Sequence, residues 1–577
     1  MTRTARPPAL ALLAAVCFLA GCAQVPTSGP VEQGEGVQAG VDEPFIRVLP
    51  QVPTAGMSPV SVVRGFLAAS ASFDGDHAVA RDYLTPAAAA SWDASAGVVV
   101  YDDEARFSLR STGRRAVELR ASIFATIDRD GSLTPRRDTS LTRAFTLRRA
   151  AGEWRIVDPP RGLYLTRLDV ERSYRALDLF FLAPRSPFLV PDPVYVPVVR
   201  PGAATSLVRA LLDGPTPWLA PAVRTAFPPR TGLVVDSVPV ENGVAQVDLT
   251  SEVLQAGEAD LAALTAQLVW TLAQLPEVTG VQLSAEGVPL TTSSSTGVQT
   301  TQDWAGFDPN AAPTGLTGVG VIDGALVQLA GEDPQPVPGP LGDGSLRLRT
   351  PAVTWSNDRT AAVSEDGTTV YVQQQAQPTR AARVYSGVAV ATPSFDGAGD
   401  LWLVDQRRTG SRVLLVPPDA ASTGGARVLR VDTASLRGRT VQQLRVARDG
   451  TRVALVLASE SGGGELVLAR VVRTRGGVEL DGLRPLERTL TDVQSVAWAT
   501  SDRIVVLAQE AGAAVQPWVV GVDATVTPTG GSLPGAVDLA AAPQRPLLAA
   551  TGDGRVWEDT GLSWREVARA TDPAYAG

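Results

Sequence analysis

Residues 315–577 weakly repeat a pattern of short strands and tight turns, and this repetition limits the possible folds more than any other feature. Two repeats place an Asp-Gly turn directly before an apolar, strand-forming run, at Asp366-Gly367 and at Asp449-Gly450. Large apolar residues recur at intervals close to the ~40–50 residues of one propeller blade. These anchors are Trp355, Phe395, Val446, Trp498 and Leu539.

The repeat predicts an all-β domain over residues 315–577. No long amphipathic helix interrupts the pattern, so each repeat fits a small antiparallel sheet. We expect a β-propeller of five to seven blades, with six favoured, and keep a pair of β-sandwiches as the alternative.

Some polar and aromatic side chains in the repeats invite a functional interpretation, but a structural one is favoured for each. Asp396, Asp400 and Asp405 lie in predicted blade turns, where carboxylates commonly accept backbone amide hydrogens and seldom bind a metal. Trp355 and Trp498 occupy predicted core-facing strand positions, so we expect packing and not stacking on a sugar. The repeats therefore supply no catalytic, cofactor-binding or metal-binding residue.

The first segment of the chain has the pattern of a secretion signal. Arg3 and Arg6 precede an apolar run, Ala9 to Leu19, that is shorter than the ~20 residues needed to span a bilayer. The run ends in Leu19-Ala20-Gly21-Cys22, which resembles the bacterial lipobox. The resemblance implies a signal peptide over residues 1–21 and cleavage between Gly21 and Cys22. It also implies an S-diacylglycerol on Cys22 and an acyl chain such as palmitate on the new amino group.

An uncleaved signal anchor with an inert cysteine is the alternative at this end. Residues 22–43 are rich in Gly, Pro, Gln and Ser, a composition typical of a flexible tether. If Cys22 is lipidated, the folded protein behind it lies on the extracytoplasmic face of the cell membrane.

Residues 44–170 change from a helical period to an alternating one, which predicts an α+β domain. Ser58-Pro59 opens the first expected helix, and a second is expected from His77 to Leu84 with Asp76 as its cap. Alternating apolar residues from Val117 onward then predict an antiparallel sheet. The order of elements resembles the nuclear-transport-factor-like cone fold, and His77 is expected to be a solvated residue near a helix start.

A second α+β domain is expected over residues 171–295, followed by a linker over 296–314. Thr205 is expected to cap a helix that stops at Gly214, and a leucine stripe predicts a longer helix over 259–275. Leu211 to Pro215, Trp270 to Leu272 and the closing Glu286-Gly287 resemble a sporulation-and-germination (GerMN) domain. The whole chain is thus predicted to be multidomain, with two α+β domains followed by an all-β propeller.

The scarcity of cysteine and histidine excludes several classes of function. Cys17 and Cys22 are the only cysteines, so the folded part has no disulfide, thiol nucleophile or cysteine metal site. His77 is the only histidine, which leaves a Ser-His-Asp triad without any other base. The net charge of -9 argues against nucleic acid as a partner. We expect no enzyme activity and no cofactor.

The order of lipobox, cone domain, GerMN domain and propeller resembles the actinobacterial lipoprotein LpqB family. Trp154-Arg155-Ile156, Pro159-Pro160 and Gly162-Leu163 fit the same family. The resemblance implies a protein that binds the outer domain of a two-component sensor histidine kinase and modulates its signalling in envelope and division control. Two alternatives remain: an envelope glycan- or solute-binding lipoprotein, and an envelope hydrolase that uses paired carboxylates.

Overall fold

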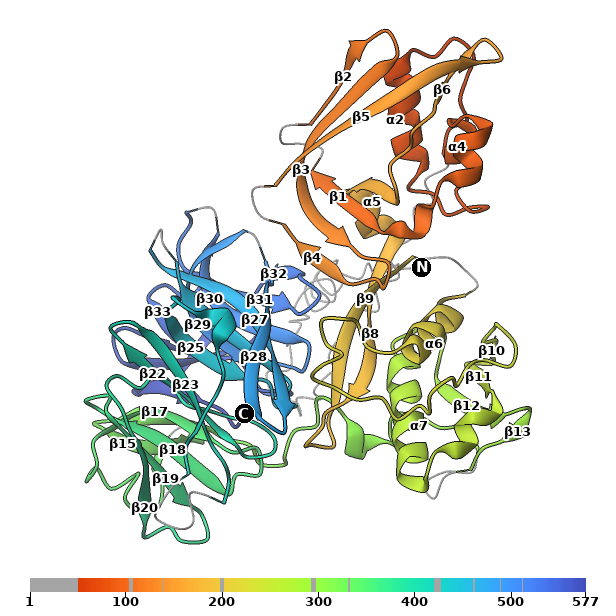
Figure 1. Cartoon of the computed structure of the whole chain (residues 1–577). Coiled ribbons are helices and arrows are strands. Elements are labelled where there is room, and N and C mark those ends of the chain that lie inside the picture. The colour runs from red at the N-terminus through yellow and green to blue at the C-terminus, as the bar shows by residue number, and fades with distance from the viewer. Residues whose placement is uncertain are drawn as a thin grey trace, which may run out of the picture. The chain divides into compact units, whose positions relative to one another are not determined.

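The computed structural model describes residues 50–102, 107–136, 139–197, 202–291, 297–330, 333–419, 427–459, 462–487, 489–510 and 512–577. Gly21, Cys22 and the expected tether lie outside the described residues. Figure 1 shows three regions along the chain, which we call the N-terminal region (50–173), the middle region (174–291) and the propeller (316–577).

A curved sheet, antiparallel except for the parallel pair β1–β7, wraps around helix α2 (Pro59–Ala69) in the N-terminal region (Figure 1). The Ser58 hydroxyl accepts the Ser61 amide hydrogen, so the predicted start of α2 is correct. Phe66 on α2 packs edge-on against Phe145 of the sheet, with ring centroids 6.4 Å apart. The other elements are α3 (Ala78–Asp82), α4 (Pro86–Ser91), η1 (Ala94–Ala96), β1 (Val98–Asp102), β2 (Ser108–Gly113), β3 (Ala116–Ile127), β4 (Leu133–Pro135), β5 (Ser140–Ala150), β6 (Glu153–Ile156), β7 (Leu163–Thr166) and α5 (Arg167–Ser173).

His77 differs from its prediction. It, and not Asp76, is the residue at the N-cap of α3, and both residues have left-handed backbone conformations. The imidazole is only 6% exposed and packs between Phe73 and Trp92, with centroids at 4.8 and 5.8 Å. Burial lowers the pKa of His77. The expectation of a solvated histidine was wrong because the aromatic partners are not visible from the local charge pattern.

The middle region combines a long hairpin, two helices and a small sheet (Figure 1). Its elements are β8 (Tyr174–Leu182), β9 (Leu189–Pro197), α6 (Ala203–Asp213), β10 (Val240–Glu241), β11 (Val244–Leu249), η2 (Ser251–Gln255), α7 (Glu258–Leu272), β12 (Gly280–Ala285) and β13 (Val288–Pro289). The predicted leucine stripe of α7 is buried in its central part, where Leu264, Leu268 and Leu272 are fully covered.

Thr205 does not cap α6. The helix begins after Gly202, which has no side chain to cap it, and Thr205 lies within the first turn. The Thr205 hydroxyl instead accepts the amide hydrogen of Val238, 33 residues away. The hydroxyl therefore fastens α6 to the loop before β10, a use that the local sequence does not reveal.

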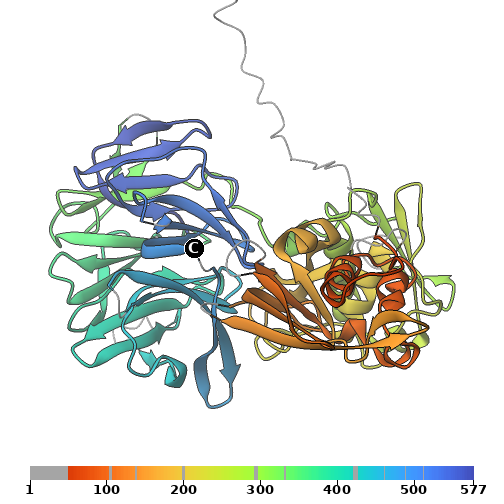
Figure 2. The same ribbon diagram turned by 90° about the horizontal axis from the view of Figure 1, so that it is seen from above.

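The described part of the propeller contains six four-stranded antiparallel sheets. Figure 2 shows them in chain order from green through cyan to blue. Their strands, sheet by sheet, are β14 (Gly318–Ile322), β15 (Ala325–Leu329), β16 (Gln335–Pro336) and β37 (Thr571–Ala574); β17 (Leu348–Val353), β18 (Arg359–Ser364), β19 (Thr369–Gln374) and β20 (Ala381–Ser386); β21 (Ser394–Phe395), β22 (Leu401–Arg407), β23 (Gly410–Val416) and β24 (Leu429–Arg430); β25 (Val441–Val446), β26 (Arg452–Ala458), β27 (Gly464–Thr474) and β28 (Gly477–Pro485); β29 (Leu490–Trp498), β30 (Arg503–Glu510), β31 (Gln516–Gly521) and β32 (Val526–Pro528); and β33 (Ala536–Ala540), β34 (Leu548–Thr551), β35 (Arg555–Asp559) and β36 (Trp564–Ala568). The short helical turns η3 (Ala305–Phe307) and η5 (Ala434–Leu436) lie in connections.

The six inner strands form a closed ring. β17, β21, β25, β29, β33 and β37 each contact the next, and β37 contacts β17. β37 is the last strand of the chain yet pairs with β14, so the first sheet is completed by the C-terminal segment. Pairing with β37 covers the edge of β14, and closure of the ring covers the sheet faces that an open array would expose at its two ends. The fold-class prediction, two α+β domains followed by a propeller, is confirmed.

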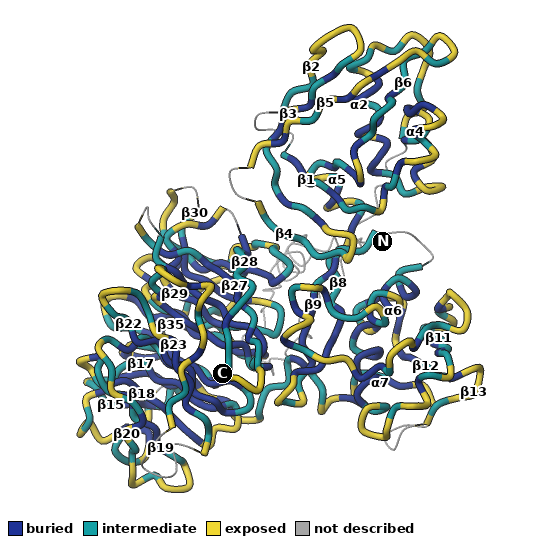
Figure 3. The backbone as a smooth tube through the Cα atoms, in the orientation of Figure 1, coloured by how far each residue is buried: buried dark blue, intermediate teal, exposed yellow. Residues whose placement is uncertain are grey.

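Strand direction divides the propeller connections between two faces. Antiparallel neighbours alternate in direction, so the β21–β22 and β25–β26 connections lie on one face, and the β22–β23 turn lies on the other. Buried residues follow the strands and exposed ones gather in the connections (Figure 3). We call the face with residues 396–400 and 447–451 the docked face, and the face with residues 408–409 and 431–440 the open face.

Candidate functional site

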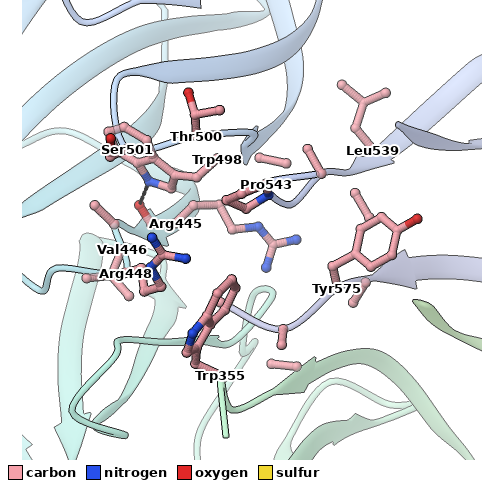
Figure 4. A pocket seen from close by; sticks show the side chains of 18 of the residues that line it. Trp355, Arg445, Val446, Arg448, Trp498, Thr500, Ser501, Leu539, Pro543 and Tyr575 are labelled. Atoms are coloured by element: carbon pink, nitrogen blue, oxygen red, sulfur yellow. Dashed lines mark hydrogen bonds between the residues drawn. The ribbon is translucent and has the colours of Figure 1, made fainter. Parts of the chain in front are cut away.

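A central pocket lies on the docked face, where the inner strands of several sheets converge (Figure 4). Its volume is about 60 Å³, room for a few water molecules but not for a sugar ring. Residues from or beside the inner strands of five sheets, and the C-terminal residues after β37, line it, among them Trp355, Arg445, Arg448, Trp498, Leu539 and Tyr575.

The chain itself fills much of the space around this pocket. Ala576 forms a parallel bridge with Val353, and the Gly577 amide donates to the Val353 carbonyl at 3.1 Å. The Arg448 guanidinium donates to the carbonyls of Pro309 and Ala311 and lies 4.1 Å from the ring of Trp355. The C-terminus and the segment before β14 therefore narrow the mouth of the pocket.

The two arginines in the pocket already have partners. Arg445 donates to the carbonyls of Pro393 and Val496, at 2.9 and 3.3 Å. Burial lowers the pKa of Arg445, and it lowers that of Arg448 to about 10. Because two hydrogen bonds from each guanidinium already go to backbone carbonyls, these cations are poorly placed to bind an anion from solution.

Trp355 and Trp498 pack against hydrophobic clusters as predicted, but both are only half-buried and border the pocket, and Trp355 lies after the end of β17. The Trp498 indole N–H donates to the Arg445 carbonyl at 3.0 Å (Figure 4). Arg448 and Arg452 cover the two rings, with guanidinium carbons 4.1 and 5.4 Å from the centroids. A cation–π contact thus covers one face of each ring, and that face is not open to a sugar.

Contacts with the middle region cover the docked face beside the pocket. Arg185, in the β8–β9 turn, forms an ion pair with Asp400, and Arg473 bridges Asp396 and Asp400 at 3.0 and 3.1 Å. Asp396 and Asp400 are 1% and 0% exposed. Burial, reinforced by the nearby Asp400 charge, raises the pKa of Asp396 to about 6.

The predicted roles of the three aspartates are partly met. Asp396 accepts the amide hydrogens of Ala398 and Asp400, at 3.1 and 2.9 Å. Asp405 accepts those of Val388 and Ala389 on the open-face side of β22. Asp396 and Asp405 cap backbone amides as expected, whereas the described partners of the Asp400 carboxylate are Arg185 and Arg473. In the described residues, no group of three or more His, Cys, Asp or Glu side chains is placed to hold a metal ion.

Arg452 is the most deeply buried cation at this junction. Its side chain is 1% exposed and pairs with Asp449 at 2.5 Å, and it donates to the Pro191 carbonyl at 3.3 Å. Asp192, the next residue of β9, is also buried and accepts both the amide and hydroxyl hydrogens of Thr216. Desolvation raises the pKa of Asp192 to about 6.

Two bulky side chains of the middle region contact propeller glycines. The Trp218 indole N–H donates to the Gly482 carbonyl at 2.5 Å, and Arg484 lies 4.6 Å from the ring. A Cβ on Gly482, whose φ is +61°, would come within 2.9 Å of the Trp218 nitrogen. A Cβ on Gly397 would come within 2.8 Å of the Phe188 ring. The absence of side chains at these two positions permits the close approach.

The sequence reasoning singled out none of Arg185, Trp218, Arg452 and Arg473. Each has a partner far away in the sequence, 215 residues for Arg185 and Asp400 and 261 for Arg452 and Pro191, although Arg452 also pairs with the nearby Asp449. No spacing or periodicity marks such a pair, and only an alignment with covarying positions could have done so. Gly21 and Cys22 lie outside the described residues, so the lipidation of Cys22 stays a prediction from the sequence. Among the described helices, none combines the length and apolarity required for crossing a bilayer.

Three family models match successive parts of the chain. "Lipoprotein LpqB, N-terminal domain" covers residues 52–171, "Sporulation and spore germination" covers 178–291, and "Lipoprotein LpqB beta-propeller domain" covers 324–576. "Lipoprotein LpqB" of Thermobifida fusca is 33% identical, and the alignment covers 97% of each chain. "Lipoprotein LpqB" of Mycobacterium bovis BCG is 31% identical over 89% of this chain and 88% of that protein. Among solved structures, TolB from Acinetobacter baumannii is 18% identical with a TM-score of 0.34, covering 45% of this chain and 66% of that one.

Proposed function

Because the chain belongs to the LpqB lipoprotein family, we propose that it is anchored by lipid on the extracytoplasmic face of the cell membrane. There it binds the outer domain of a two-component sensor histidine kinase and modulates its signalling. The observation that carries a binding role is the docked face: its pocket is narrow and Arg473 pairs with both Asp396 and Asp400, so the described residues of this face offer a rigid surface and no reaction centre.

Cys22 carries the anchor in this proposal. The lipobox Leu19-Ala20-Gly21-Cys22 supports cleavage after Gly21 and acylation of Cys22, and two or three acyl chains bind a bilayer stably. Cys22→Ala should abolish incorporation of labelled fatty acid and leave uncleaved or shed protein. Label retained by the variant would contradict the anchor.

Membrane confinement supports a weak but effective contact with another membrane protein. Two partners held at one surface meet at a high effective concentration, so modest affinity suffices. The family resemblance supports a sensor kinase as that partner, since such kinases have extracytoplasmic domains beside the membrane.

Crosslinking in intact cells tests the proposal directly. The crosslinked full-length protein should capture a sensor histidine kinase, and its deletion should change phosphorylation of the cognate response regulator. No kinase among the captured proteins, together with unchanged regulator phosphorylation, would overturn the proposal.

The two alternative functions fit the docked face less well. A glycan has no room in a pocket of about 60 Å³ whose tryptophans are covered by arginines. A hydrolase needs two carboxylates that reach the substrate, whereas Asp396 and Asp400 are buried and share Arg473.

A further inference from the structure

A second, wider pocket lies on the open face between the third and fourth propeller sheets. Its volume is about 400 Å³, and it is formed by the β22–β23 turn, the end of β24 and the crossover to β25. Residues 409–411, 430–434 and 436–439 line it. β22 has seven residues at about 3.3 Å each, so this pocket lies roughly 20 Å from the Asp396–Asp400 cluster.

The chain around this pocket is strongly basic although the protein is acidic overall. Residues 407–439 contain seven arginines and two aspartates, while the whole chain carries a net charge of -9. Arg430, Arg437 and Arg439 line the pocket, and Arg430 and Arg437 are exposed. In the described part of the chain, only Arg439 of these three has an ion-pair partner, Glu465 at 2.6 Å.

The backbone that carries these arginines is held in place. The Asp432 amide donates to the Val478 carbonyl, and the Asp432 carbonyl accepts from Leu480, both at 2.8 Å. The Ser435 hydroxyl donates to the Leu480 carbonyl at 2.7 Å, and Leu436 is buried. Asp432 itself accepts the Ala434 amide hydrogen. The fixed crossover presents Arg430 and Arg437 without a large ordering cost on binding.

We propose that this pocket is an anion-recognition site for the carboxylates of an acidic segment on a partner protein. The planar guanidinium forks of Arg430 and Arg437 suit carboxylates, which they bind in a bidentate manner. Because the middle region occupies the docked face, a partner reaches the open face without displacing it. The proposal rests on the proposed function only for the identity of that partner, the kinase outer domain.

A protein segment fits the pocket better than a lipid surface. None of the exposed large apolar side chains in the described residues lines the pocket, so nothing there would insert into a bilayer. The pocket is also concave and lies between two loops, a shape that accepts a few side chains and not a flat array of headgroups.

Binding of a fluorescent ten-residue glutamate peptide to the detergent-extracted full chain tests the site. We expect saturable binding that weakens with salt, and a loss of about tenfold or more in the double variant Arg430→Glu/Arg437→Glu. The matched control is Arg380→Glu/Arg383→Glu, which makes the same charge change at exposed arginines near the outer strand of the second sheet. The control should retain the affinity of the native protein.

Other outcomes overturn the proposal. Equal losses in both double variants would show a non-specific charge effect, and no loss in either would remove the pocket from binding. Binding of inorganic polyphosphate or anionic vesicles, but not of the peptide, would assign the pocket to another polyanion.

The purified kinase outer domain is then tested with the same variants. If the native protein fails to bind the kinase domain, that result contradicts the proposed function alone, because the peptide result stands by itself. Kinase binding retained by Arg430→Glu/Arg437→Glu would contradict the site alone.

Discussion

The two propeller faces use arginine in opposite ways. On the docked face, Arg448, Arg452 and Arg473 donate to backbone carbonyls or to buried carboxylates, and the central pocket, which Arg448 lines, is narrow. On the open face, Arg430 and Arg437 extend from a fixed crossover into a wide pocket. Arginine therefore has a structural role where its hydrogen-bond donors are satisfied within the chain. Where they are not, it is available to bind a partner.

This difference explains why fold alone does not locate function in a propeller. A central pocket lined by aromatic and basic residues would ordinarily be the first candidate for a ligand. Here the segment before β14, the C-terminus and carbonyls of the propeller itself take up its polar groups. The hydrogen-bond partners of each cation are thus a better guide to function than the position of the pocket.

The largest expected effect comes from Arg452→Ala on the docked face. The change leaves Asp449, whose side chain is 3% exposed, as a buried carboxylate without its cation, at a cost of about 3–5 kcal/mol in unfolding free energy. Denaturant unfolding of the full chain measures it. A loss below about 1 kcal/mol would mean that water reaches the Arg452–Asp449 pair. The arginines of the docked face would then not differ from those of the open face in burial.

The pH dependence of stability tests the buried carboxylate of Asp192. Its pKa is about 6 in the folded chain against an ordinary value of 3.8, so the folded state holds the proton more tightly. The resulting stabilisation is present below about pH 4 and is lost as the pH rises through about 6, an effect on the order of 3 kcal/mol.

Asp192→Asn keeps a similar shape and can retain both contacts with Thr216. Measured from pH 4 to 7, the variant should lack this loss and gain stability relative to the native protein as the pH rises. If the unfolding free energies of the two proteins changed with pH in the same way, the raised pKa of Asp192 would be contradicted.

Trp218→Ala should weaken the contact of the middle region with the propeller by about 2 kcal/mol. It removes the hydrogen bond to Gly482 and the contact with Arg484. Amide hydrogen exchange in residues 183–191 should accelerate. Trp564→Ala is the control, because its indole N–H also donates to a glycine carbonyl, Gly531, within the propeller. Acceleration in both variants would show general loosening of the fold.

The smallest effect is expected at the open pocket. Arg430→Ala and Arg437→Ala should each change the unfolding free energy by about 0.5 kcal/mol or less, because neither has an ion-pair partner among the described residues. A thermal unfolding series measures both. A loss above about 1 kcal/mol would give these arginines a structural role and weaken the case for recognition.

Local signals in the sequence predicted the elements well where neighbours along the chain decide the structure. Ser58-Pro59 marked the start of α2, the alternation from Val117 marked β3, and the spacing of the anchors marked the propeller. The same signals failed at His77, whose exposure depends on Phe73 and Trp92, residues brought together only by folding.

The sequence by itself determined the order of domains and the family, and it predicts a lipobox at Cys22, because periodicity and short motifs are properties of neighbouring residues. The tertiary structure alone decided which charges are free. Whether an arginine is satisfied depends on carbonyls and carboxylates contributed by distant segments, as Pro191 and Asp449 are to Arg452. Burial and hydrogen bonding are set by the whole packed chain, so the distinction between the docked face and the open face could emerge only there.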